Sequence, residues 1–197
     1  MILEGLVTTL GIDGQLNIAP MGPNVATGMD RFVLRPFVSS TTFANLAARE
    51  EGVFHVMDDV LLLAQTAIGQ AVAPATREAT RVRGRILSDA CRYYEFRVQS
   101  IDATDQRAMI LVETVASGRI RDFLGFNRAR HAVVEAAILA TRVGLIEPDT
   151  ILDEFRRLEP LVDKTGGSQE REAFDLLTNH VREAATRLRP VPDRPEA

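Results

Sequence analysis

The sequence predicts a mainly β protein with additional α-helices: a small antiparallel barrel followed by a C-terminal helical extension. Two observations carry this prediction. The first two-thirds of the chain holds six or seven short segments rich in β-forming residues, several of them separated by hairpin-like turns. From about residue 126 the pattern changes to three long stretches in which apolar residues recur at helical spacing.

Composition and charge fit this class and exclude several others. The 197 residues are 46% hydrophobic and 25% charged, which is typical of a folded domain. The formal net charge of −4 argues against nucleic acid or an anionic membrane as a partner. The longest apolar stretch, residues 131–146, contains Glu135 and Arg142 and is too short to span a bilayer. A single cysteine, Cys91, excludes an internal disulfide and favours a cytoplasmic location.

The expected strands follow from local patterns. Residues 2–10 and 16–22 form a hairpin, because Asp13-Gly14 between them is a strong turn signal. Residues 29–37 alternate between apolar and polar side chains, as a half-buried strand should. The remaining strands are expected at residues 53–59, 81–87, 91–102 and 107–118.

Two short helices are expected inside the strand-rich part, one from the hydroxyl run at residues 39–42 to Gly52 and one over residues 60–70. Three longer helices follow over residues 127–146, 149–166 and 168–189, with Asn127, Asp149 and Ser168 at the N-cap positions. We therefore divide the chain into a barrel at residues 1–125, a helical region at 126–190 and a disordered Pro-rich tail at 191–197.

The segment from Arg35 to Asn45 is the candidate binding site. Four consecutive hydroxyl residues, Ser39 to Thr42, follow Arg35 at the start of the first helix. A helix N-terminus carries unpaired N–H groups and a partial positive charge, so it binds phosphate, and hydroxyl and guanidinium groups add donors. The same residues also fit an ordinary helix cap with Arg35 in a surface ion pair. The spacing alone leaves both interpretations open.

Four segments, residues 3–24, 34–46, 53–60 and 125–142, together resemble the DUF447 family, whose members look like FMN-binding split barrels of the flavin reductase type. Ser40-x-Thr42-x-x-Asn45-Leu46 is similar to the S-x-T-x-x-N-[IL] stretch of that group. Asn17 to Gly22 matches its N-x-A-P-M-G strand end. His55 departs from the pattern, because the family more often has Asn there.

The resemblance implies an antiparallel split barrel that forms a homodimer, with FMN in a groove at the subunit interface. The backbone around Ala19, Pro20 and Met21 would meet the polar edge of the flavin ring. The phosphate would lie on a cluster of five residues: Arg35, Ser40, Thr41, Thr42 and Asn45.

A second candidate group lies in the helix that begins near Asn127. Arg128 and His131 are three residues apart on one helix face, and Glu135 follows four residues later. Either Arg128 and His131 form a second cationic contact to the cofactor, or they form an internal network with Glu135. The sequence does not tell which of the two subunits would supply this contact. We assign no catalytic residue, and no set of side chains has the spacing of a metal site.

The function that these observations favour is an FMN-binding flavoprotein, an oxidoreductase that acts on a small-molecule substrate. Two alternatives stay open. The first is a non-catalytic FMN carrier or sensor, and the second is a binding barrel without a flavin. The sequence does not distinguish FMN from a deazaflavin, and it does not identify the substrate or electron donor.

Overall fold

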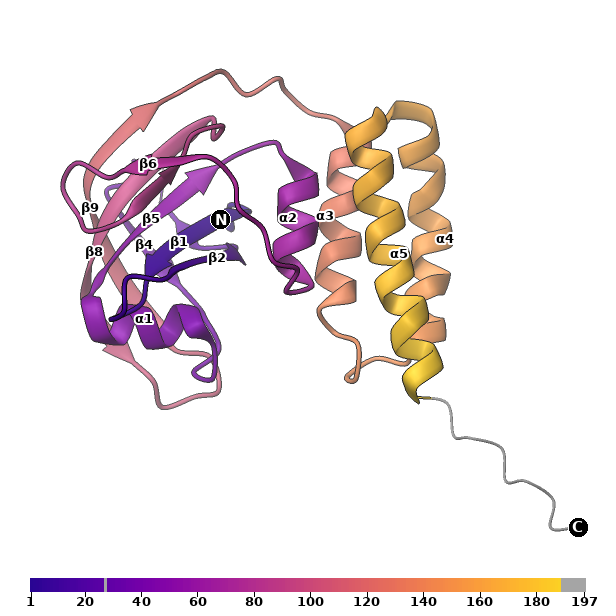
Figure 1. Cartoon of the computed structure of the whole chain (residues 1–197), viewed down its shortest axis with the longest axis horizontal. Helices are drawn as coiled ribbons and strands as arrows, with labels where there is room; N and C mark the ends of the chain where they lie inside the picture. Colours follow the sequence, from indigo (N-terminus) through magenta and orange to yellow (C-terminus); the bar gives the residue numbers. More distant parts are fainter. Residues whose placement is uncertain (27, 189–197) are drawn as a thin grey trace, which may run out of the picture. The chain divides into compact units, whose positions relative to one another are not determined.

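The computed structural model of the chain describes residues 1–26 and 28–188, and these form two compact units (Figure 1). The first unit contains residues 1–59 and 71–125, and it holds all the strands and the first helix. The second contains residues 60–70 and 126–188 of the described chain, and it is helical. The expected disordered tail lies outside the described residues.

Seven strands form one antiparallel sheet in the order β2-β1-β5-β8-β9-β4-β3. Their bounds are β1 Gly5–Leu10, β2 Leu16–Met21, β3 Asn24–Val25, β4 Arg31–Leu34, β5 Glu51–Val56, β8 Arg92–Asp102 and β9 Met109–Arg119. The expected antiparallel barrel with C-terminal helices is thus confirmed. A separate hairpin consists of β6 Thr76–Glu78 and β7 Arg85–Leu87.

The N-terminal residues pair with β3, the last strand in the sheet order, and with the segment just before it. Val25 on β3 donates its N–H to the Met1 carbonyl at 2.8 Å, and Leu3 donates to the Pro23 carbonyl at 3.2 Å. Residues 1–3 lead directly into β1, which is the second strand in the sheet order. The β3 edge therefore lies beside the segment that precedes β1. The strand set therefore curls into a barrel in which the β3 edge is covered and the β2 edge stays free.

The first hairpin has the expected turn. Gly14 has φ +82°, a conformation that glycine adopts without steric cost, and its N–H bonds with the Gly11 carbonyl at 2.9 Å. Beside this hairpin lies α1, Thr41–Arg49, which contacts both β1 and β2. Arg49 donates to the carbonyls of Gly11 and Ile12 at 2.7 and 2.8 Å, so the C-terminal end of α1 is attached to the hairpin turn.

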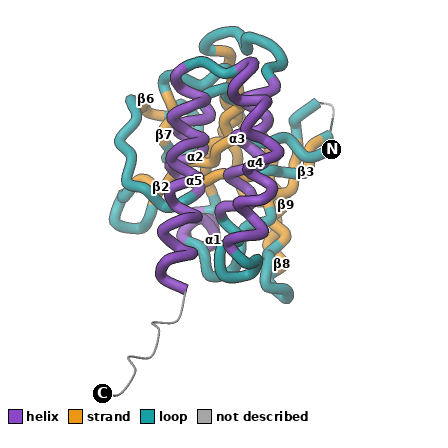
Figure 2. Tube along the Cα trace, turned by 90° about the vertical axis from the view of Figure 1, so that its right-hand side faces the viewer, coloured by secondary structure: helices purple, strands orange, loops and turns teal. Residues whose placement is uncertain are grey.

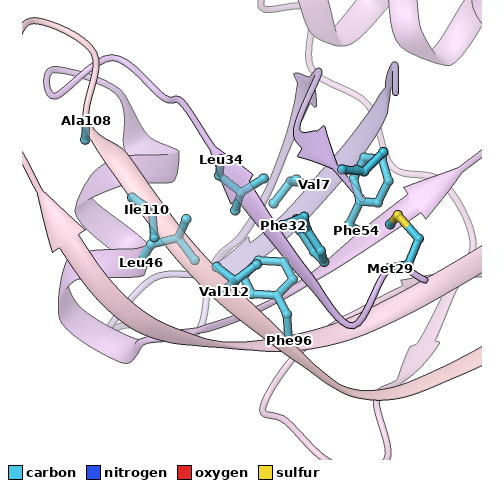
Figure 3. Packing of buried hydrophobic residues seen from close by; sticks show 11 residues of the cluster. Val7, Met29, Phe32, Leu34, Leu46, Phe54, Phe96, Ala108, Ile110 and Val112 are labelled. Carbon is cyan, nitrogen blue, oxygen red and sulfur yellow. The ribbon is translucent and has the colours of Figure 1, made fainter. Parts of the chain in front are cut away.

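The barrel interior is filled by apolar side chains from most of its strands (Figure 3). Phe32 lies between two other rings, with centroids 5.5 Å from Phe96 and 5.8 Å from Phe54. Leu46 contributes the apolar face of α1 to the same cluster and is fully buried. Tyr94 packs on this inner cluster, whereas Tyr93 packs on a smaller cluster at the outer face, as neighbours in a strand should.

The outer face of β5 and β8 is covered by the β6–β7 hairpin. Val82 and Ile86 of the hairpin segment pack against Val53. The hairpin loop is fixed by the buried Glu95 carboxylate, which accepts hydrogen bonds from the backbone N–H groups of residues 80, 81 and 82 at 2.5–3.2 Å and from the Thr80 hydroxyl at 2.8 Å. Both oxygens of the Glu95 carboxylate therefore accept hydrogen bonds from within the barrel unit.

His55 connects three strands of the barrel. Its Nδ1 lies 3.3 Å from the Leu6 carbonyl, and its Nε2 accepts the Leu87 N–H at 3.1 Å. This arrangement requires a neutral ring that donates at Nδ1 and accepts at Nε2. Burial lowers the pKa of His55 to about 4, although the Leu6 carbonyl opposes the shift. The departure from the family pattern at this position is thus accommodated by two backbone hydrogen bonds.

The helical unit consists of α2 Val60–Ala67, α3 Arg128–Ala140, α4 Pro148–Thr165 and α5 Ser168–Leu188 (Figure 2). The helix α3 is rich in alanine and packs against the other three, because small residues permit close approach. Phe155 and Phe174 contact each other across α4 and α5 with centroids 5.4 Å apart. No helix among the described residues is both long and apolar enough to cross a bilayer.

Three local expectations differ from the structure. Ser168 is the first residue of α5 and not its N-cap. Asp149 is not the N-cap of α4: the cap position belongs to Glu147, and Asp149 lies in the first turn because Pro148 starts the helix. The helix α2 falls within the range expected for the barrel, yet it packs with α3 and α5. Asn127 is the N-cap of α3 as predicted, and its Oδ1 accepts the Arg130 N–H at 3.1 Å.

Candidate functional site

The hydroxyl run forms the N-terminus of α1 in the barrel unit. Ser40 is the N-cap, because its Oγ accepts the Phe43 N–H at 3.2 Å, and it also donates to the Phe37 carbonyl at 2.7 Å. Within residues 1–26 and 28–188, no acceptor receives the N–H of Thr41 or of Thr42. The first turn therefore has two free backbone donors and no acidic residue.

The inward side of the same turn is a polar network. Asn17 Nδ2 donates to Thr9 Oγ1 at 3.2 Å and to Thr42 Oγ1 at 3.0 Å, and Asn45 Nδ2 donates to Thr9 Oγ1 at 3.0 Å. Thr9, Thr42 and Asn45 are all buried. This network fixes the N-terminal half of α1 against β1 and β2. A hydroxyl that accepts a hydrogen bond keeps its own O–H donor, so Thr42 retains one donor in addition to its bond with Asn17.

The outward side of the turn carries two cations. Arg35 is exposed and lies in the short segment that leads into α1. That segment pairs with the residues just before β9: the Val38 N–H bonds with the Gln106 carbonyl, and the Ala108 N–H bonds with the Pro36 carbonyl, both at 3.0 Å. The pairing brings Arg107, which is far from Arg35 in sequence, next to it.

The strand β2 lies at an edge of the sheet, and among the described residues it pairs with β1 alone. Asn17 of this strand bonds to Thr42 at the start of α1. Ala19, Pro20 and Met21 continue along β2, up to about 13 Å from Asn17 at the usual rise per residue. The structure therefore brings the two sequence motifs together, and the free edge of β2 extends away from the α1 N-terminus.

Arg128 and His131 lie on α3, which belongs to the other unit. Both side chains are exposed, and the His131 ring meets the Phe126 ring edge-on at 5.9 Å. In the described part of the chain, no ion pair joins Glu135 to either of them. The ion pair in this region instead joins Arg130 to Glu170 at 2.9 Å, which links the start of α3 to the start of α5.

Several other titratable groups of the barrel lie together around Arg121. Arg121 Nη2 lies 2.5 Å from Asp58 Oδ1, and its Nε lies 3.3 Å from Asp89 Oδ1. Burial raises the pKa of the Cys91 thiol, and the nearby Asp58 carboxylate raises it further, so the thiol is protonated at neutral pH. In residues 1–26 and 28–188, no group of three or more His, Cys, Asp or Glu side chains is placed to hold a metal.

Sequence reasoning missed Arg107 and Thr9. Arg107 approaches the site through a bridge between Phe37 and Arg107, seventy positions apart, which no local pattern reveals. Thr9 lies in an ordinary strand pattern, and only the fold shows that two amide groups converge on its hydroxyl.

Solved structures identify the class of barrel. The chain resembles the crystal structure of an FMN-bound protein from Methanosarcina mazei with 26% identity and a TM-score of 0.80, over 91% of this chain and 94% of that one. It also resembles 2-nitrobenzoate 2-nitroreductase from Pseudomonas fluorescens (23% identity, TM-score 0.52, 59% and 64% of the two chains). A flavin reductase domain protein from Arthrobacter is similar as well (16% identity, TM-score 0.52, 61% and 79%). The barrel is a split barrel of the flavin reductase type.

Family models give the particular assignment. Residues 3–121 match the N-terminal domain of DUF447, described as a protein of unknown function, and residues 127–179 match a second DUF447 model. The first match alone covers more than half of the chain, so the chain belongs to the DUF447 family. The Methanosarcina mazei protein is described as a member of the same family. No curated protein matches the chain significantly.

Proposed function

We propose that this protein is an FMN-binding flavoprotein that acts as a flavin-dependent reductase on a small-molecule substrate. The observation that carries the proposal is the α1 N-terminus, where the N–H groups of Thr41 and Thr42 have no partner among the described residues, and the exposed Arg35 lies in the segment that leads into this helix. Support comes from the FMN-bound family member from Methanosarcina mazei, whose chain is similar over nearly its whole length.

The chemistry of these donors fits the cofactor. A phosphate dianion accepts hydrogen bonds from helix N-terminal N–H groups, from hydroxyls and from guanidinium groups, and the site has all three. Ser40 and Thr41 present hydroxyls at the start of the helix, whereas Thr42 and Asn45 also hold the helix in place. The free edge of β2 at Ala19–Met21 offers backbone groups to the polar edge of a flavin ring.

Bound FMN would supply the redox chemistry. The protein's own groups would bind the phosphate, orient the ring along β2 and shield it from water. The proposal includes a homodimer in which the partner subunit contributes the Arg128 and His131 face, and a cytoplasmic location.

The first test is the visible absorption spectrum of the purified full-length chain, followed by titration of the colourless form with FMN and with riboflavin. We expect flavin absorption bands and an FMN affinity at least about tenfold higher than the riboflavin affinity, since only FMN carries the phosphate. A chain that takes up neither flavin would contradict FMN binding. Equal affinities would contradict the phosphate site.

A second test separates a reductase from a carrier. Anaerobic addition of NADH or NADPH to the FMN-loaded protein should bleach the flavin bands, and addition of an electron acceptor should restore them. Bands that persist with both nucleotides, and that bleach only with dithionite, would favour a non-catalytic carrier or sensor. Sedimentation of the same sample tests the homodimer.

A further inference from the structure

We propose that Arg107 is a second phosphate-binding cation of the FMN site, and that it strengthens the preference of the site for FMN over riboflavin. This inference rests on the proposed function. It concerns a residue that lies outside both sequence motifs and that enters the site only through the fold.

The backbone places Arg107 on the same surface as Arg35. Phe37 and Arg107 are directly opposite each other in an antiparallel bridge. Side chains alternate between the two faces of such a ladder, and Pro36 and Ala108, the neighbours of this pair, are buried. Arg35, Phe37 and Arg107 therefore share the outer face, and all three are exposed.

The Arg107 guanidinium is held in a defined position. Its Cζ lies 4.0 Å from the centroid of the Phe37 ring, and its Nη1 donates to the Arg35 carbonyl at 3.4 Å. A guanidinium has five N–H donors, so most of them remain for another acceptor. A side chain that is already ordered loses less conformational entropy when it binds an anion.

This position lies at the mouth of the proposed phosphate site. The Phe37 carbonyl accepts the N–H and the hydroxyl of Ser40, the N-cap of α1. Phe37, on whose ring the Arg107 guanidinium stacks, is thus bonded directly to the N-cap that precedes Thr41 and Thr42. Arg107 also contacts the Arg35 carbonyl, so both arginines belong to the segment that leads into α1, where guanidinium donors can reach a dianion at the helix N-terminus.

No neighbouring carboxylate neutralises Arg107 in the part of the chain that the structure describes. Asp102 of the preceding turn accepts hydrogen bonds from the N–H and hydroxyl of Thr104, and these lower its pKa. Asp105 is two residues away, but it makes no ion pair with Arg107 among the described residues. The positive charge of Arg107 therefore faces solvent, where salt would screen its attraction to an anion.

The test compares FMN and riboflavin binding to the full chain at low and high salt. Arg107→Ala should weaken FMN binding about tenfold at low salt and change riboflavin binding by less than about twofold. Arg107→Lys keeps the charge and should recover most of the FMN affinity. Arg119→Ala is the matched control: Arg119 is also an exposed arginine, at the C-terminal end of β9, and it is paired with Asp122 at 2.8 Å. It should leave both affinities unchanged.

The outcomes separate this inference from the proposed function. If the wild-type chain prefers FMN but Arg107→Ala behaves like Arg119→Ala, the role of Arg107 is wrong and the phosphate site stands. If Arg107→Ala weakens FMN and riboflavin equally, Arg107 only supports the loop, and the inference is also overturned. A wild-type chain that does not distinguish FMN from riboflavin overturns the phosphate site, and the role of Arg107 falls with it.

Discussion

The two sides of the α1 N-terminus use polar groups in opposite ways. On the inward side, Thr9, Asn17, Thr42 and Asn45 are joined in a network that satisfies amide and hydroxyl groups within the barrel. On the outward side, the Arg35 side chain is exposed, and the N–H groups of Thr41 and Thr42 have no acceptor in the part of the chain that the structure describes. Residues of one sequence motif thus have two physical roles, one that holds the helix and one that is available to a ligand.

This difference gives a general criterion for the polar groups of the barrel. A buried polar group whose partners all lie within the protein should contribute mainly to stability, because its loss leaves those partners unsatisfied. An exposed cation with unused donors should contribute mainly to binding. Tyr93 and Tyr94, the only tyrosines of a chain without tryptophan, both lie on β8, so tyrosine fluorescence of the flavin-free protein reports unfolding of the barrel alone.

The largest expected effect on stability is at Glu95. Burial raises the pKa of its carboxyl, but the hydrogen bonds from residues 80–82 together outweigh that effect and hold the pKa below its ordinary value. Glu95→Ala should destabilise the barrel by about 4 kcal/mol, since several buried donors lose a charged acceptor. Urea unfolding followed by tyrosine fluorescence measures this. Glu95→Gln, which keeps the shape and one acceptor oxygen, should cost less. Equal free energies of unfolding for wild type and Glu95→Ala would contradict the criterion.

His55 provides a pH test of the same criterion. Burial lowers its folded-state pKa from 6.5 to about 4, so the unfolded chain binds the proton more strongly. The resulting stability is present above pH 6.5 and is lost as pH falls from 6.5 to 4, by about 3 kcal/mol in total. Urea unfolding at pH 7.5 and pH 5 should show the loss in the wild type. The same comparison in His55→Asn should show a much smaller loss, and an identical loss would assign the effect to other groups.

Asn45 tests whether the inward network holds α1 in place. Asn45→Ala removes a buried donor to Thr9 and should destabilise the barrel by about 2 kcal/mol. Hydrogen exchange of the α1 amides measures the effect locally and should show faster exchange. Exchange at the wild-type rate would mean that the network does not hold the helix. FMN binding should weaken only as far as α1 is displaced, so saturating FMN should restore much of the lost protection.

The smallest expected effect on stability is at Arg35. Arg35→Ala should change barrel stability by less than about 0.5 kcal/mol, because the side chain is exposed. FMN affinity should nevertheless fall about tenfold, with little change for riboflavin. Titrations with both flavins, together with a urea curve, measure the two quantities. A large loss of stability with an unchanged ratio of flavin affinities would place Arg35 with the structural groups.

Local signals in the sequence predicted much of the fold and the chain segments of the candidate site. Asp13-Gly14 marks the first hairpin, and Ser40 and Asn127 are the caps of α1 and α3, because turns and caps depend on residues a few positions apart. The inward network and the approach of Arg107 could not be predicted in this way. Their hydrogen bonds join residues 36 and 72 positions apart, which only the strand order brings together.

The placement of α2 has the same explanation. Its apolar residues indicate a helix with a buried face, but a face pattern does not identify the partner. The partners are α3 and α5, which begin more than sixty residues later.

The central claim is that the free N–H groups of the first turn of α1 bind the phosphate of FMN. Amide chemical shifts of isotope-labelled protein, recorded with FMN and with riboflavin at saturation, test it directly. We expect the Thr41 and Thr42 resonances to shift strongly with FMN and only weakly with riboflavin. Shifts at both residues that are the same for the two flavins, or absent while β2 responds, would contradict the claim.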